Sequence, residues 1–256
     1  MMITKPPRLA ALMLILAGCS TSPPAPDVQI TETKSVQPVS EAPSGDPWQQ
    51  TALALKALPK GYHQQSELST MSTEGQQRFA QGVDLLTQNK LAEAHKLFVN
   101  LAEQSPQISA IWLQLAQLQG KTVKSSDIAS EQQTALDLQT RYLKNAISTH
   151  PDNYIAHNQL AVLLRRQGLF NEALNHYDMA LKSWPAFAEA RLNRAILYDL
   201  YLGNKPAALE DYQVYQALVS QPVRQLKGWI ADLQRQIHSQ QQQFNATSGS
   251  IKGEIQ

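Results

Sequence analysis

The stretch that decides the fold is Tyr154–Pro185, YIAHNQLAVLLRRQGLFNEALNHYDMALKSWP. Its first half places Leu160, Ala161 and Leu164 on one helical face, and Gly168 then interrupts the helix. Its second half brings a further set to one face at i, i+4 and i+7 spacing, namely Ala173, Tyr177, Ala180 and Leu181. The pattern predicts two antiparallel helices that approach closely where small side chains face each other.

The same pattern recurs along the chain at shared offsets. Small residues recur with separations of 34, 45 and 34, at Gly82, Ala116, Ala161 and Ala195. Bulky residues recur with separations of 45, 34 and 35, at Phe98, Leu143, Tyr177 and Tyr212. Prolines close the units 45 and 34 residues apart, at Pro106, Pro151 and Pro185. Three lattices with one offset pattern predict a repeat architecture rather than an accidental spacing in a helical bundle.

These units resemble tetratricopeptide repeats (TPRs). The resemblance implies an all-α fold, an α-solenoid of about four TPR-like helix pairs. The flanking sequence adds a C-terminal capping helix and a disordered N-terminal tether to this expected fold. The second unit departs from the pattern by 11 extra residues (45 minus 34), for which we expect an enlarged loop at Gly120–Lys124. Gln139 replaces the small residue of the other units, so we expect looser packing there. Gly203 comes one residue late, which predicts a longer turn.

The chain begins with a segment typical of secretion. Lys5 and Arg8 precede an apolar run, Leu9–Ala17, that is too short to span a bilayer but suits a signal sequence. The run ends in Leu-Ala-Gly-Cys at residues 16–19, which resembles a bacterial lipoprotein lipobox. The resemblance implies that Cys19 is lipidated, palmitate included, and becomes the mature N-terminus. Ser20, where an Asp would resemble an inner-membrane retention signal, favours the outer membrane, facing the periplasm.

The composition completes the domain organisation. Six prolines among Ser, Thr and Glu make the segment after Cys19 a semi-extended tether. The expected order is a signal peptide (1–18), the lipidated cysteine and tether (19–47), a short helix and linker (48–72), the repeat domain (73–221), a capping helix (222–243) and a disordered tail (244–256). Trp48–Leu58 is the expected short helix, and the capping helix carries an apolar stripe that includes Leu226 and Leu233.

In the family that the units resemble, the first helix of each unit lines a concave groove that binds peptides or partner helices. The positions that match as the partner-binding groove are Gln114, Gln117, Asn158, Gln159, Val162, Arg165, Arg166 and Asn193. Three amides, Gln114, Gln159 and Asn193, recur just before the packing position and form a ladder suited to an extended peptide. The unit-one lining adds apolar Phe79, Val83 and Leu86.

Alternatives to this groove remain open. The three amides can also be simply solvated, since the chain is rich in glutamine. Arg165 and Arg166 can form a solvated helix face or can contact an acidic partner. The apolar lining of unit one can hold the chain's own Trp48–Leu58 helix, a guest, or a second copy in a homo-oligomer. The expected partners are other envelope proteins or peptides, and the membrane through the lipid on Cys19.

The sequence carries few signs of catalytic, metal-binding or nucleic-acid-binding chemistry. A balance of 22 basic and 21 acidic residues argues against nucleic acid as a partner. The six histidines show no metal-ligand spacing, and we find no cofactor motif or nucleophile elbow, so we expect no catalytic residues, no metal and no cofactor. The sequence predicts a non-catalytic adaptor in pilus, secretin, outer-membrane protein or peptidoglycan machinery. The alternative is a periplasmic hydrolase or peptidoglycan-active enzyme whose site is assembled only in space.

Overall fold

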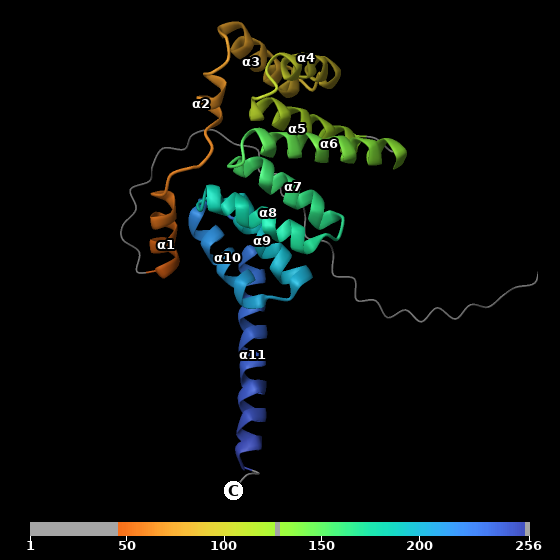
Figure 1. Ribbon diagram of the computed structural model, residues 1–256. Coiled ribbons are helices and arrows are strands. Elements are labelled where there is room, and N and C mark those ends of the chain that lie inside the picture. Colours follow the sequence, from red (N-terminus) through yellow and green to blue (C-terminus); the bar gives the residue numbers. More distant parts are fainter. Residues whose placement is uncertain (1–45, 126–128, 254–256) are drawn as a thin grey trace, which may run out of the picture. The chain divides into compact units, whose positions relative to one another are not determined.

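The computed structural model describes residues 46–125 and 129–253, all within the unit Ser35–Gln256 (Figure 1). These residues form helices and no strand. The helices are α1 (Pro47–Lys56), α2 (Gln64–Leu68), α3 (Thr73–Thr87), α4 (Leu91–Gln104), α5 (Ser109–Ser125), α6 (Ala129–Thr149), α7 (Tyr154–Arg166), α8 (Phe170–Ser183), α9 (Ala188–Leu197), the π-helical turn η1 (Tyr198–Leu202), α10 (Lys205–Leu218) and α11 (Leu226–Gly253). The predicted signal peptide and Cys19 lie outside the described residues, as does the predicted tether up to residue 45.

Consecutive helices pair along the chain. The most extensive contacts join α3 with α4, α5 with α6, α7 with α8, and α9 with α10. Each pair also touches the next through its second helix, since α4 meets α5, α6 meets α7, and α8 meets α9. The predicted all-α solenoid of four helix pairs is therefore confirmed.

The residues of the sequence lattice explain the pairing. Gly82 faces Phe98 so closely that a Cβ atom there would lie 2.6 Å from the ring, and the two helices of unit one meet at this point. The small residues of the other units are all fully buried: Ala116, Ala161, Ala173, Ala195 and Ala208. The bulky positions Phe98, Leu143, Tyr177 and Tyr212 are at most 1% exposed. Burial of such side chains contributes about 1.5–3 kcal/mol each, so the lattice is the core of the fold.

The second unit lengthens its helices instead of its loop. Helix α5 runs through Gly120–Lys124 to Ser125, where the sequence predicted a loop, and that prediction is wrong. The continuation is favoured because α6, with 21 residues, is also long and makes more extensive contacts with α5 than any other pair of helices makes in the described part of the chain. A Cβ atom on Gly120 would lie 2.8 Å from the Gln139 amide nitrogen. Glycine on α5 thus makes the room that the other units obtain from a small residue on their second helix.

The fourth unit absorbs its extra residue inside the helix. The five residues of η1 continue α9 as a π-helical turn, and Gly203 ends it in the left-handed region with φ 66°. In unit three, Gly168 has the same role with φ 79°, directly after α7 and its cap residue. A π turn accommodates one more residue within a helix, so the extra residue lies in η1 and not in the longer turn that the sequence predicted.

The C-terminal helix packs on the last pair. Leu226 and Leu233 of α11 are 0% and 1% exposed, and Trp229 lies 5.6 Å from the Tyr212 ring. Helix α11 begins four residues after Pro222 (226 minus 222) and extends ten residues past the expected end (253 minus 243). The glutamine-rich run favours this extension because glutamine is a good helix former and no proline interrupts it.

The N-terminal segment, residues 46–72, crosses the repeat units in reverse order, and we call it the strap. Helix α1 contacts α10 of unit four. The Lys60 ammonium lies 3.9 Å from the Trp184 ring, and the Gly61 amide donates to the Ser183 carbonyl at 2.8 Å. At the far end, Met71 is buried in the core of unit one. The strap therefore ties the last repeat to the first.

Two strap side chains anchor it at the middle units. Tyr62 is 1% exposed, lies 6.3 Å from the Tyr154 ring, and donates to the Glu67 carboxylate at 2.9 Å. Glu67 also accepts from the backbone N–H groups of Ser109 (2.7 Å) and Ala110 (3.0 Å) at the start of α5. A carboxylate at a helix N-terminus satisfies unpaired donors and the helix dipole, so Glu67 caps α5 from outside its own unit.

Candidate partner-binding surface

The predicted groove residues come from α5, α7 and α9, the first helices of units two to four. The structure divides them by exposure. Gln114, Asn158 and Arg165 are buried, at 8%, 4% and 7% exposure. Gln117, Gln159, Val162 and Asn193 are half-buried, and Arg166 is exposed. The exposed and half-buried positions, which we call the first-helix row, are the part of the predicted groove that a partner can reach.

The amide ladder has a different register from the one expected. The Asn193 side-chain N–H donates to the side-chain Oδ1 of Asn158 at 3.1 Å, across α9 and α7. Asn158 lies one position before Gln159, which was the expected partner in the series. Gln114 is nearly covered by its surroundings, so it has little amide surface to offer a guest. Of the three predicted ladder residues, Gln159 and Asn193 keep accessible surface.

Arg165 belongs to the core of units three and four. Its guanidinium lies 5.8 Å from the Tyr201 ring, within the range of a cation–π contact. Tyr177 of α8 interacts with it: burial raises the pKa of the phenol to about 12, while the Arg165 charge acts in the opposite direction. The charge of Arg165 thus faces aromatic rings of its own chain, whereas Arg166 projects from the next position toward solvent.

Large apolar side chains gather where α7 and η1 end. Leu169, Leu200 and Tyr201 are 43%, 52% and 44% exposed, and Phe170 lies 4.8 Å from the Tyr201 ring. We call these four residues the turn patch. The π-helical turn produces it, because the extra residue of η1 places Leu200 and Tyr201 on the surface in succession. Sequence reasoning missed the patch, and only the late Gly203 marked the place.

The lining of unit one is not covered by the Trp48–Leu58 segment. Phe79 and Leu86 are 4% and 7% exposed, and they pack within the unit's own core. The Lys121 ammonium of α5 donates to the Leu86 carbonyl at 3.2 Å. Helix α1 lies instead against α10, so the open alternative of self-occupation at unit one is not what the structure shows.

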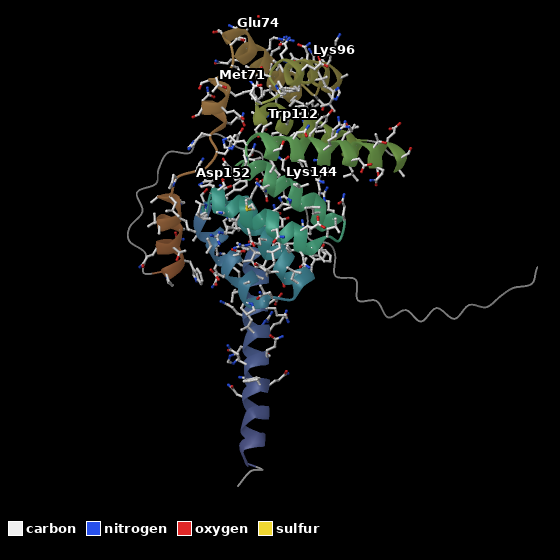
Figure 2. The ribbon with its side chains drawn as sticks, viewed as in Figure 1. Met71, Glu74, Lys96, Trp112, Lys144 and Asp152 are labelled. Atoms are coloured by element: carbon white, nitrogen blue, oxygen red, sulfur yellow. The ribbon has the colours of Figure 1, made fainter. Side chains whose placement is uncertain are left out.

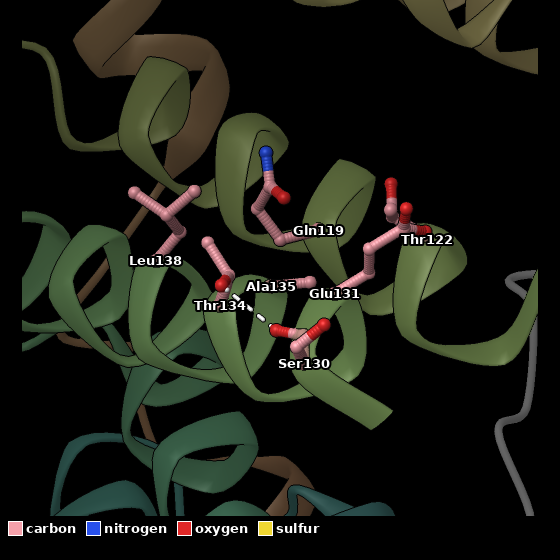
Figure 3. A pocket seen from close by; sticks show the side chains of 7 residues that line it. All are labelled: Gln119, Thr122, Ser130, Glu131, Thr134, Ala135 and Leu138. Carbon is pink, nitrogen blue, oxygen red and sulfur yellow. Dashed lines mark hydrogen bonds between the residues drawn. The ribbon is translucent and has the colours of Figure 1, made fainter. Parts of the chain in front are cut away.

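The first-helix row lies apart from the cavity between α5 and α6, which has a volume of about 320 Å³ (Figure 3). Its lining residues are Gln119, Thr122, Ser130, Glu131, Thr134, Ala135 and Leu138. It results from the longer helices of unit two. Figure 2 shows Trp112 at the start of α5, where its indole nitrogen donates to the Pro106 carbonyl at 2.7 Å. Trp112 stacks on Tyr142 of α6, so it is a contact within the unit.

The histidines form a pair rather than a metal site. His157 and His176 approach to 2.9 Å between their Nδ1 atoms, and His157 Nε2 contacts the Pro151 carbonyl at 2.9 Å. Since that carbonyl can only accept, His157 carries its proton on Nε2, and His176 donates from Nδ1. Burial lowers the pKa of both rings, that of His176 to about 4, where His157 and Lys144 add to the effect. Within the described ranges, no group of three or more His, Cys, Asp or Glu is arranged to hold a metal ion.

No helix among the described residues is both long and apolar enough to cross a membrane. Residues 140–186 and 158–221 match a family model described as tetratricopeptide repeat. No curated protein sequence matches the chain. Similar solved structures include a thermophilic TPR protein from Thermus thermophilus, with a TM-score of 0.51 and 19% identity over 63% of this chain and 81% of that chain.

A tetratricopeptide repeat protein from Parabacteroides merdae is similar to the same degree, with a TM-score of 0.51 and 19% identity over 70% of this chain and 68% of that chain. At this level of identity the likeness concerns the fold. Together with the four helix pairs, it shows that the regular units seen in the structure are of the TPR kind. Residues 140–221 therefore match the tetratricopeptide repeat model, and the helix pairs form a fold of the TPR type.

Proposed function

We propose that this protein is a non-catalytic outer-membrane lipoprotein that faces the periplasm and binds partner proteins as an adaptor in envelope assembly. The lipobox ending in Cys19 supports the anchor and the address. Tetratricopeptide domains are typically interaction scaffolds without catalytic residues, which supports an adaptor. The partners belong to pilus, secretin, outer-membrane protein or peptidoglycan machinery.

The turn patch is the observation that carries the proposal. Large apolar side chains that are exposed near one another on a surface mark interaction sites, because their burial in a partner removes apolar area from water. Arg165 lies under the Tyr201 ring, so the patch adjoins the helix that also carries Val162 and Arg166 of the first-helix row. A partner helix or peptide can therefore make apolar contacts at the patch and polar contacts along the row.

The burial pattern shows which residues of the predicted groove a partner can contact. Gln159, Val162 and Arg166 are accessible on α7, whereas Asn158 and Arg165 beside them are buried. The accessible set lies at i, i+3 and i+7, which is one face of a helix. We assign partner contact to this face and to Gln117 and Asn193 on the neighbouring first helices.

In-cell photo-cross-linking tests the proposal. A photoreactive amino acid at Gln159, Arg166 or Tyr201 should capture the same partner protein, to be identified by mass spectrometry. The matched control is Gln242, an exposed glutamine of α11 away from both surfaces. The proposal would be contradicted if the photoreactive group at Gln242 captured the same proteins in the same amounts as the groups on the first-helix row.

The anchor has its own test. Cys19→Ser should move the protein from the membrane fraction to the soluble fraction and should leave purified-partner binding unchanged. Retention in the outer membrane at the wild-type level would contradict the lipid anchor and leave the binding surface to be judged on cross-linking.

A further inference from the structure

A second cavity, with a volume of about 450 Å³, lies where the strap meets the C-terminal end of the repeats. Helices α1, α10 and α11 line this open cavity, and Asp46 lies directly before α1. The lining residues are Asp46, Trp48, Gln49, Gln213, Gln216, Ala217, Ile230 and Gln234. It is separate from the first-helix row, which belongs to α5, α7 and α9.

Amide groups dominate the lining. Four glutamines from three helices converge on the cavity, and one of them is engaged. In the amide orientation that satisfies both groups, Gln213 accepts from the Trp48 indole N–H at 3.2 Å and donates to the Leu209 carbonyl at 3.3 Å. The side-chain amides of Gln49, Gln216 and Gln234 make no hydrogen bond within the part of the chain that the structure describes.

The lining excludes several ligand classes. It contains no Lys, Arg or His and has one carboxylate, so it does not suit phosphate or another anion. Its aliphatic surface is limited to Ala217 and Ile230, whereas sites for apolar ligands are lined predominantly by apolar side chains. Helices also offer no free backbone edge for an extended peptide. What is left is a neutral ligand rich in hydroxyl and amide groups.

We propose that this cavity binds a neutral glycan that carries acetamido groups. A primary amide offers a donor and an acceptor side by side, which pair with the N–H and C=O of an acetamido group or with adjacent hydroxyls. The half-buried Trp48 indole supplies apolar surface for the C–H face of a sugar ring. The Asp46 carboxylate accepts from the Trp48 backbone N–H at 2.9 Å and has acceptor capacity left for a hydroxyl.

The location adds a consequence. The glycan would contact the strap on one side and α10 with α11 on the other, so binding would hold α1 in place. Ligand that binds only the docked arrangement stabilises it by mass action. The site thus goes beyond the proposed adaptor role and does not depend on it.

Calorimetric titration of the full-length protein in detergent with chitotriose, a trimer of N-acetylglucosamine, tests the inference. We expect a Kd of about 1 mM or tighter, in the range of weak specific ligands. Gln216→Ala and Gln234→Ala should each weaken binding by about fivefold, as expected for one lost hydrogen bond. The matched control is Gln236→Ala, an exposed glutamine on the same helix outside the cavity, which should bind like the wild type.

The remaining measurements can overturn the inference. Cellotriose, which has the same ring size without acetamido groups, should bind about tenfold more weakly, and equal affinity for the two sugars would overturn the proposal. The proposal would also be overturned if no binding were detected at a chitotriose concentration about 10-fold above the expected Kd of about 1 mM. The same holds if Gln216→Ala and Gln234→Ala retain wild-type affinity while their circular dichroism spectra show an intact fold.

Discussion

Tyr62→Ala should detach the strap and lower the free energy of unfolding. Tyr62 is 1% exposed and packs among Tyr154 and Phe187 in the cluster that joins the strap to unit three. Truncation of a fully buried aromatic side chain costs about 3–5 kcal/mol, since the residual cavity adds to the lost transfer energy. The hydroxyl bond to Glu67 disappears as well, and that leaves the cap of α5 with one partner fewer.

The measured loss also reports how the strap is coupled to the repeats. In a repeat protein each unit contacts only its neighbours, and stability is a sum of local terms. The strap adds contacts across all four units, so we expect one cooperative transition and a loss of about 3–5 kcal/mol. If the strap could separate while the repeats stayed folded, the measured loss of unfolding free energy would be limited to the free energy with which the strap binds the repeats.

Urea unfolding of the full-length chain, followed by far-UV circular dichroism, measures this loss. Tyr62→Phe retains the ring and removes the hydroxyl, so it should cost about 1.5–3 kcal/mol as a bond to a charged group. Tyr201→Ala removes a tyrosine that is 44% exposed and should cost less than about 1 kcal/mol. A loss below about 1 kcal/mol for Tyr62→Ala would refute the close packing of the strap.

Three further predictions concern the repeats. Gly82→Ala should destabilise the fold by about 1–3 kcal/mol, because its Cβ would lie 2.6 Å from the Phe98 ring, and denaturant unfolding measures the loss. Asp211→Ala should cost about 3–5 kcal/mol by the same measurement, since it removes the buried carboxylate that two arginines of α9, Arg194 among them, bind at 2.7–2.9 Å. Stability should fall as pH decreases from about 6.5 toward about 4, because burial holds the pKa of His176 below its unfolded value, and His176→Leu should reduce that slope.

Matched variants check each of these. Gly228→Ala, where a Cβ meets nothing within 4 Å, should be neutral or stabilising, and an equal loss at both glycines would contradict the contact with Phe98. Asp178→Ala removes a carboxylate that is 48% exposed, so it should cost less than about 1 kcal/mol. A pH profile that is identical in the wild type and in His176→Leu would contradict the role of the histidine pair.

Parts of the candidate surface were predictable and parts were not. The sequence placed Gln159, Val162 and Arg166 on the first helix of unit three, and the structure leaves all three accessible. It gave no means to distinguish them from the buried Asn158 and Arg165, because burial there depends on how α9 and η1 pack against α7. The turn patch was invisible for a similar reason, since a late glycine does not reveal that the helix continues as a π turn.

The sequence by itself determined the repeating units. The offsets of Gly82, Ala116, Ala161 and Ala195 specify the fold because each helix pair builds its core from residues close in the chain, and such local cores leave a periodic signature. Tertiary structure decided the rest. The strap's route through Tyr62 and Glu67 and the amide-lined cavity depend on contacts between residues far apart in sequence. The helical form of Gly120–Lys124 depends on the long partner helix α6. Neither kind of contact produces a periodic pattern in the sequence.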